Sequence, residues 1–137
     1  MTTKQMKALS FACQSAEEAE YMMEKITRLL AQCDTLSAMG ADREWVQTRR
    51  ADLMHEAARA KTVLAHSREQ CARFEEILCG CPDGQTEQIL RLRFQRHYSW
   101  QNIALRLGGG NTGEGVRKRA ARYLAAVDEA CKTVSRN

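Results

Sequence analysis

Apolar side chains recur at helical spacing along most of the chain. The first group lies before Gly40 and follows one face of an α-helix. Its members are Ala16, Ala19, Met22, Met23, Ile26, Leu30 and Cys33. Ser15-Ala16-Glu17-Glu18 has the form of a capping box, whereas three earlier apolar residues continue the stripe backward. The pattern therefore predicts one helix that begins either near Thr3 or near Ser15 and stops at Gly40.

The next group of apolar residues follows alternating steps of four and three, which is the spacing of a coiled-coil seam. Asp42 can cap this helix, which we expect from Arg43 to Leu78, with Arg50 and Ser67 as polar exceptions to the seam. The seam consists of Val46, Leu53, Ala57, Ala60, Leu64, Cys71, Phe74 and Leu78. Because the link before this helix is short, the two helices should form an antiparallel hairpin. Two helices alone bury little, so we expect the free edge of the hairpin to form a homodimer.

A second break follows at Cys79-Gly80-Cys81-Pro82-Asp83-Gly84, where proline and glycine interrupt the helical pattern. Three shorter helices are predicted after it: from about Gln85 to Arg96, from Trp100 to Leu107 behind a Ser99 cap, and near 112–131, capped by Asn111 or Thr112. The predicted fold class is all-α. It comprises a hairpin domain over residues 1–80 for dimerisation and a three-helix module over residues 84–137.

The last two predicted helices and their glycine-bearing turn have the layout of a helix-turn-helix, which places its last helix in the DNA major groove. At ~100° per residue, Lys118 and Arg122 lie opposite the apolar stripe that contains Val116. The glycines between Gly108 and Gly115 can supply positive φ angles and let helix amides approach a phosphate. The candidate DNA contacts are Ser99, Gln101, Thr112, Glu114, Arg117, Lys118, Arg119 and Arg122.

The charge distribution agrees with an anionic partner at one end of the chain. Residues 85–137 hold ten Lys and Arg against four Asp and Glu, although the whole chain carries a net charge of only +4. A solvated basic face is the plainer explanation of the same excess. Double-stranded DNA is the partner that the helix-turn-helix layout favours.

Other chemistries lack their motifs. The glycines follow a helix rather than a strand, which excludes a dinucleotide loop, and His55-Glu56 lacks the second histidine of a zinc protease. We expect no enzyme, no cofactor and no metal, including at Cys79 and Cys81. Without an export signal or an apolar membrane span, the six cysteines should be reduced thiols in a cytoplasmic protein. Four of them lie on apolar helical faces as small hydrophobic residues: Cys13, Cys33, Cys71 and Cys131.

The segment ILRLRFQRHYSWQNIALRLG, Ile89 to Gly108, resembles the fourth region of sigma-70-type RNA polymerase sigma factors. The resemblance covers about the last 50 residues. With the hairpin ahead of it, the layout is similar to ArpU-like phage and prophage regulators. It implies a DNA-reading role for Thr112, Glu114, Arg117 and Lys118. The turn departs from that pattern by two additional glycine-rich residues, since eight residues separate Leu107 from Val116.

These observations favour a sequence-specific DNA-binding transcriptional regulator of the phage or prophage type, which reads the major groove with the helix near 112–131. One alternative is a DNA-packaging subunit of the small-terminase kind, which would form a ring of eight or more copies. Another is a sigma-like adaptor that binds RNA polymerase with a merely solvated basic face. Mass in solution and binding to duplex DNA separate the three.

Overall fold

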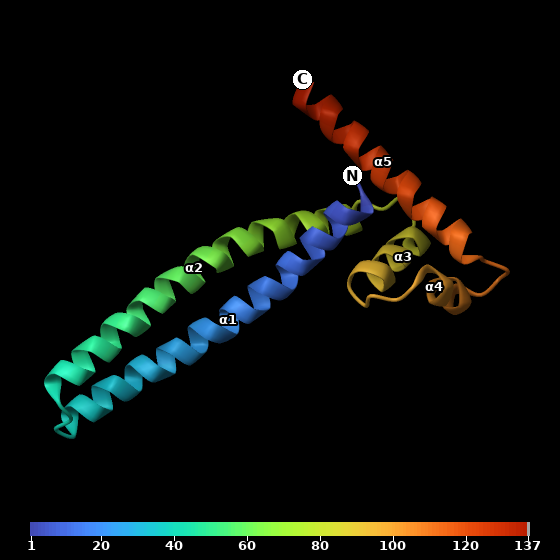
Figure 1. Cartoon of the computed structure of the whole chain (residues 1–137). Coiled ribbons are helices and arrows are strands. Elements are labelled where there is room, and N and C mark those ends of the chain that lie inside the picture. The colour runs from blue at the N-terminus through green and yellow to red at the C-terminus, as the bar shows by residue number, and fades with distance from the viewer. Residues whose placement is uncertain (137) are drawn as a thin grey trace. The chain divides into compact units, whose positions relative to one another are not determined.

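Five α-helices make up the chain in a computed structural model that describes residues 1–136, with side chains described up to residue 128. They are α1 (Thr3–Ala38), α2 (Arg43–Cys79), α3 (Gly84–Phe94), α4 (Trp100–Leu107) and α5 (Gly113–Arg136), and the described residues include no strand (Figure 1). The all-α prediction is confirmed, as are two long helices followed by three shorter ones.

The first helix begins at Thr3 rather than at Ser15. Thr2 Oγ1 accepts from the Gln5 amide at 3.2 Å, and Gln5 Oε1 accepts from the Thr2 amide at 2.8 Å. This reciprocal pair is the true capping box of α1. Ser15 lies inside the helix, so the capping box inferred at Ser15 to Glu18 is wrong.

Gly40 and Asp42 shape the link between α1 and α2 as the sequence predicts. Gly40 has φ +88°, and the next amide, of Ala41, donates to the Leu36 carbonyl at 3.0 Å. Asp42 Oδ2 accepts from the Trp45 amide at 3.0 Å and caps α2.

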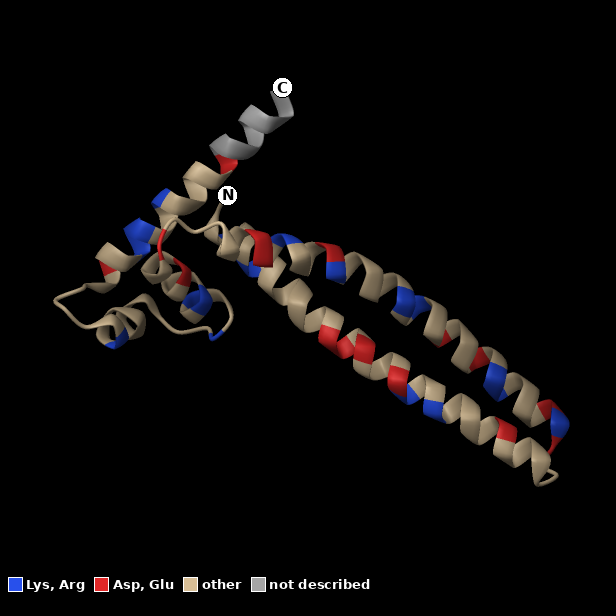
Figure 2. Cartoon of the chain, turned by 180° about the vertical axis from the view of Figure 1, so that it is seen from behind, with Lys and Arg blue, Asp and Glu red and all other residues tan. Residues whose placement is uncertain are grey.

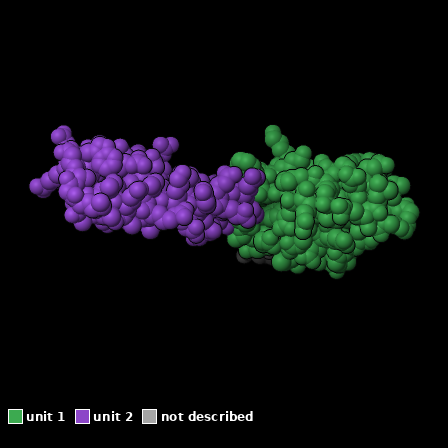
Figure 3. Space-filling model, turned by 90° about the horizontal axis from the view of Figure 1, so that it is seen from below, with its two compact units in different colours: residues 1–11, 71–137 green, residues 12–70 purple. Residues whose placement is uncertain are grey.

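The chain divides into two compact units, residues 12–70 and residues 1–11 with 71–137 (Figure 3). Unit 2, residues 12–70, is the distal part of the α1–α2 hairpin. Its core has one cluster around Ile26, Cys33, Val46 and Leu53 and another around Ala16, Ala19 and Leu64.

The coiled-coil seam is largely covered within one chain. Val46, Leu53 and Leu64 are buried, and Arg50, one of the two polar exceptions, forms an ion pair with Asp34 of α1. These seam positions are therefore covered by α1 within one chain, and the expected homodimer stays a prediction.

Unit 1 combines α3, α4 and α5 with both ends of the hairpin. Residues 1–11 belong to it, and Met6 and Leu9 are buried there. Ser10 Oγ donates to the carbonyl of Phe94 and so holds the last residue of α3. The other buried hydrophobic residues of this unit are Phe74, Ile77, Leu78, Ile89, Leu90, Phe94, Ile103, Ala104, Val116, Ala120 and Leu124.

The cysteines differ in state. Cys33, Cys79 and Cys81 are free, whereas Cys13 and Cys71 are disulfide-bonded. The expectation of reduced thiols is therefore wrong for Cys13 and Cys71, because helical spacing predicts burial but not whether another sulfur lies within bonding distance. The side chain of Cys131 lies outside the described residues. Within the described residues, no helix combines the length and apolarity that crossing a membrane requires.

Candidate nucleic-acid interface

The core of the module is the packing of α4 against α5, supported by α3. Ile103 and Ala104 are the buried residues of α4, and Val116, Ala120 and Leu124 form the buried stripe of α5. Ser99 begins α4 as predicted, since its side chain accepts from the Asn102 amide at 3.2 Å. The predicted bounds of α4, Trp100 to Leu107, are those observed.

Three consecutive glycines connect α4 to α5, and each has a left-handed backbone. Their φ angles are +67° at Gly108, +63° at Gly109 and +77° at Gly110. A Cβ at any of the three would meet no atom within 4 Å, so these positions require glycine for its backbone freedom rather than for space. Asn111 then donates from its side-chain amide to the Gly108 carbonyl at 2.7 Å, which closes the turn.

The start of α5 lies against the start of α4. Thr112 is the cap, because its Oγ1 accepts from the Gly115 amide at 3.0 Å. A Cβ on Gly113 would come within 3.2 Å of the Gln101 backbone nitrogen and 3.4 Å of the Trp100 carbonyl carbon. Gly113 therefore permits a close backbone approach that brings the first turns of the two helices together.

The outer face of α5 carries the predicted reading residues. Glu114, Lys118 and Arg122 are exposed at intervals of four, whereas Val116 and Ala120 are buried on the other side of the helix. Figure 2 marks the Lys and Arg positions of the chain in blue and the Asp and Glu positions in red. Lys118 and Arg122 form no hydrogen bond or ion pair within the described part of the chain. Two cations one turn apart, neither of them in a hydrogen bond or ion pair among the described side chains, are thus exposed to solvent.

Two of the predicted contacts are paired with each other. Arg117 Nη2 lies 2.5 Å from Glu114 Oε1, and Arg117 Nε donates to Glu114 Oε2 at 3.0 Å. The hydrogen bonds from Arg117 lower the pKa of Glu114, and the same contact raises the pKa of Arg117. Both groups are exposed, so water or a ligand competes readily with this pair.

Arg119 takes part in the fold of the module. Its guanidinium forms an ion pair with Asp83 at 2.9 Å and donates to Thr86 Oγ1 at 3.2 Å and to Gln85 Oε1. Asp83 also caps α3 by accepting from the Thr86 amide at 2.7 Å, and that bond is the main reason why the pKa of Asp83 is lowered. Arg119 therefore fastens α5 to the start of α3, which the sequence did not indicate.

Two arginine–aromatic contacts near the α3–α4 turn were also not foreseen. The guanidinium carbon of Arg93 lies 4.7 Å from the ring centroid of Trp100, and that of Arg106 lies 4.3 Å from the ring of Tyr98. Between them His97 has φ +60°. α3 ends at Phe94, two residues before the predicted Arg96. These contacts could have been predicted from the arginines on both sides of the Tyr98-Ser99-Trp100 segment.

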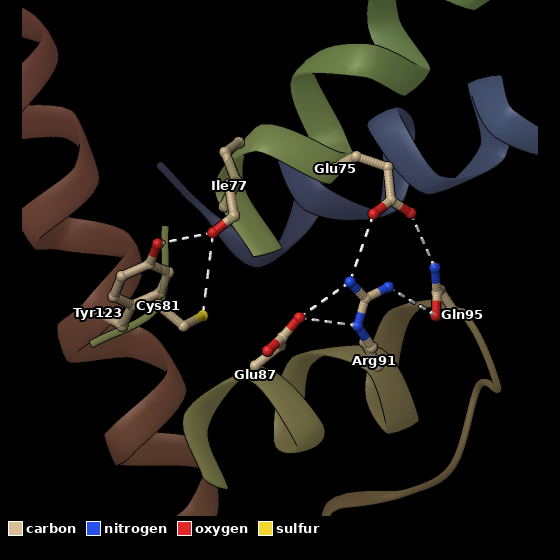
Figure 4. Close-up of polar contacts among 7 residues, drawn as sticks. All are labelled: Glu75, Ile77, Cys81, Glu87, Arg91, Gln95 and Tyr123. Carbon is tan, nitrogen blue, oxygen red and sulfur yellow. Dashed lines mark hydrogen bonds and ion pairs between the residues drawn. The ribbon is translucent and has the colours of Figure 1, made fainter. Parts of the chain in front are cut away.

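Further polar contacts hold the end of α2 to α3 and α5 (Figure 4). Arg91 of α3 binds Glu87 at 2.9 Å and Glu75 of α2 at 3.4 Å. Tyr123 of α5 donates its hydroxyl to the Ile77 carbonyl at 2.6 Å, and burial raises the pKa of Tyr123 to about 12. The Tyr123 bond anchors α5, the helix that carries Lys118 and Arg122, to the end of α2, and the Arg91–Glu75 pair holds α3 there.

Cys81 lies in the break between α2 and α3. Burial raises the pKa of the Cys81 thiol, whose sulfur lies 3.9 Å from the Ile77 carbonyl oxygen. Among the described side chains, no group of three or more His, Cys, Asp or Glu is placed to hold a metal ion.

Comparison of the chain with protein-family models, with curated proteins and with solved structures finds no match. The resemblance to sigma region 4 therefore rests on the residues of α3 and α4 themselves.

Proposed function

We propose that this protein is a sequence-specific DNA-binding transcriptional regulator of the phage or prophage type, which inserts the first half of α5 into the major groove. The observation that carries the proposal is the outer face of α5, where Lys118 and Arg122 are exposed and unpaired within the described residues, beside the exposed Glu114. The resemblance to sigma region 4 and to ArpU-like regulators supports the phage setting. Such a regulator would act in the cytoplasm.

The position of a residue along α5 should decide whether it contacts a base or a phosphate. In helix-turn-helix proteins, residues near the start of the second helix reach base edges. Glu114 can accept from the exocyclic amine of cytosine, and Lys118 can donate to guanine O6 or N7. Arg122 lies one turn farther along, where the duplex backbone is the nearer target. Specificity should therefore depend on Glu114 and Lys118, and general affinity on Arg122.

The exposed Glu114–Arg117 ion pair can open when DNA replaces water on this surface. Exposed ion pairs contribute only about 0–1 kcal/mol in general, so opening such a pair costs little. Arg117 can then turn to a phosphate or to guanine, while Glu114 keeps acceptor capacity for cytosine. Arg119 would act indirectly, by holding α5 on α3.

The start of α4 can bind the same strand. Ser99 and Thr112 use their side-chain oxygens to cap α4 and α5, and their hydroxyl hydrogens remain able to donate to phosphate. Gln101 is exposed, and its backbone lies beside Gly113. Two adjoining helix starts, each with a positive dipole end, favour a phosphate between them.

The test is a set of single substitutions measured by fluorescence anisotropy on a duplex selected from a random library and on random duplex. Arg122→Ala should weaken binding to both duplexes about equally and reduce the salt slope by roughly one unit. Lys118→Ala should cost about 1–3 kcal/mol on the selected duplex and relax its sequence preference. Arg28→Ala, which removes an exposed cation from unit 2, is the matched control and should leave binding unchanged.

The double variant Lys118→Ala with Arg122→Ala decides the proposal. Both side chains are exposed, so circular dichroism should show an intact fold. If this folded variant binds DNA as tightly as the wild type, α5 is not the reading helix and the RNA polymerase adaptor becomes the better explanation.

A further inference from the structure

The middle of unit 2 has an open, mainly apolar hollow of about 460 Å³ between α1 and α2. Its floor includes Ala19 of α1 and Ala60 of α2, and its rim includes Met22 and Val63. These two rim side chains are 41% and 50% exposed. The single chain leaves this hollow unfilled.

Small side chains are the cause of the hollow. Between the buried Leu53 and Leu64, the seam of α2 supplies only Ala57 and Ala60, which are half-buried. Accordingly, the buried residues around Ile26 and those around Ala16 form separate clusters. A side chain from another molecule can therefore enter between them without displacing the core.

Charge around the hollow differs between its two sides. From Ser15 to Ile26, α1 carries four glutamates and one lysine, whereas from Leu53 to Leu64, α2 carries one glutamate against one arginine and one lysine. Glu18 lines the hollow from α1, and Glu56 and Arg59 line it from α2. Neither Glu18 nor Arg59 forms an ion pair within the described residues. The acidic side of one hairpin is thus complementary to the basic side of an identical hairpin.

We propose that two copies of this chain pack hollow against hollow as parallel hairpins, with Glu18 of each copy paired with Arg59 of the other. A two-fold axis along the hairpin places α1 of one copy on α2 of the other, so opposite charges meet twice. The antiparallel alternative places α1 on α1, where glutamates would face glutamates. Met22 and Val63 then fill the hollow of the opposite copy.

This association depends on unit 2 and is independent of the proposed DNA binding. In a parallel pair, both chains continue toward unit 1 from the same end of the hairpin, because α1 and α2 run antiparallel in each copy. The antiparallel pair would send the two chains out at opposite ends.

Sedimentation equilibrium on charge-reversal variants of the full chain tests the pairing. Glu18→Arg alone and Arg59→Glu alone each turn two attractive contacts into repulsive ones, and each should weaken dimerisation at least about tenfold. Arg28→Glu is the matched control, because Arg28 is exposed on α1 and does not line the hollow, and it should leave the dimer unchanged. Circular dichroism checks that each variant remains helical.

Mixing the Glu18→Arg variant with the Arg59→Glu variant gives the decisive measurement. In a mixed dimer the two substituted side chains face each other with their charges exchanged, and the unchanged Glu18 faces the unchanged Arg59. Association should therefore return to within about threefold of the wild type. A contact inside one chain cannot produce this rescue. A monomeric wild type at high micromolar concentration, a ring of eight or more copies, or a mixture no tighter than its components would each overturn the proposal.

Discussion

The substitution Gly→Ala should have opposite effects on stability at two positions of unit 1. One is Gly109, in the turn between α4 and α5, and the other is Gly84, at the start of α3. Gly109 has φ +63°, a conformation that costs an alanine roughly 1–2 kcal/mol. Since no atom lies within 4 Å of the added Cβ, backbone strain is the whole penalty. Alanine also lowers the conformational entropy of the unfolded chain, which offsets about 0.4–1 kcal/mol of this strain. The free energy of unfolding of unit 1 should therefore fall by about 1 kcal/mol in Gly109→Ala.

Gly84 is the matched control. It begins α3 without a positive φ, and a Cβ there also meets no atom within 4 Å. Gly84→Ala should therefore stabilise the unit by about 0.4–1 kcal/mol. Gly109→Asn should fall between wild type and Gly109→Ala, because asparagine tolerates the left-handed region better than alanine does.

Urea unfolding followed by tryptophan fluorescence measures these differences. Trp45 reports on unit 2 and Trp100 on unit 1, so a Trp45→Phe background isolates the unit that contains the turn. The midpoint should decrease for Gly109→Ala and increase for Gly84→Ala at an unchanged slope. Equal midpoints for the two alanine variants would refute the reasoning, because they would mean that the turn holds no left-handed strain.

Two further predictions concern unit 1. The pKa of Tyr123 is raised to about 12, so the folded state favours the neutral phenol. The free energy of unfolding should therefore fall as pH rises from about 10 through 12. Tyr123→Phe should lose this pH dependence, and it should also lose the tyrosinate absorbance step near pH 12. Ser10→Ala removes the hydroxyl that donates to the Phe94 carbonyl and should cost about 0.5–1.5 kcal/mol in urea unfolding, whereas Ser37→Ala, at an exposed position of α1, should cost less than about 0.5 kcal/mol. Equal effects of the two serine changes would contradict a role for residues 1–11 in unit 1.

Patterns that repeat within one helix predicted the elements well. The stripes of α1 and α2, the Asp42 and Ser99 caps and the glycine stop at Gly40 were all visible in the sequence, because each depends on neighbours along the chain. The start of α1 was left open, because three apolar residues before Ser15 continue the stripe while Ser15 to Glu18 has the form of a capping box. The box at Thr2 and Gln5, which has the same form, was missed. A capping-box sequence does not show whether the helix has already begun at an earlier residue.

Contacts between distant segments were the part that sequence patterns missed. Arg119 stood among the exposed cations by helical angle, yet it reaches Asp83, which precedes it by 36 positions. Residues 1–11 belong to unit 1, where Ser10 bonds to Phe94, which follows it by 84 positions. The position of a residue around a helix predicts the direction of its side chain, but it does not predict which other element that side chain contacts.

The close approach at Gly113 has a consequence for the length of the turn. Because α5 is held on α4 at Gln101, the five residues from Gly108 to Thr112 need only span the gap between two helices that are already docked. Lengthening a flexible connection from three to five residues adds only about 0.5 kcal/mol of closure entropy. Turn length can therefore drift among related sequences while the helix pair stays the same, and a difference of two residues is a weak sign of a different binding geometry.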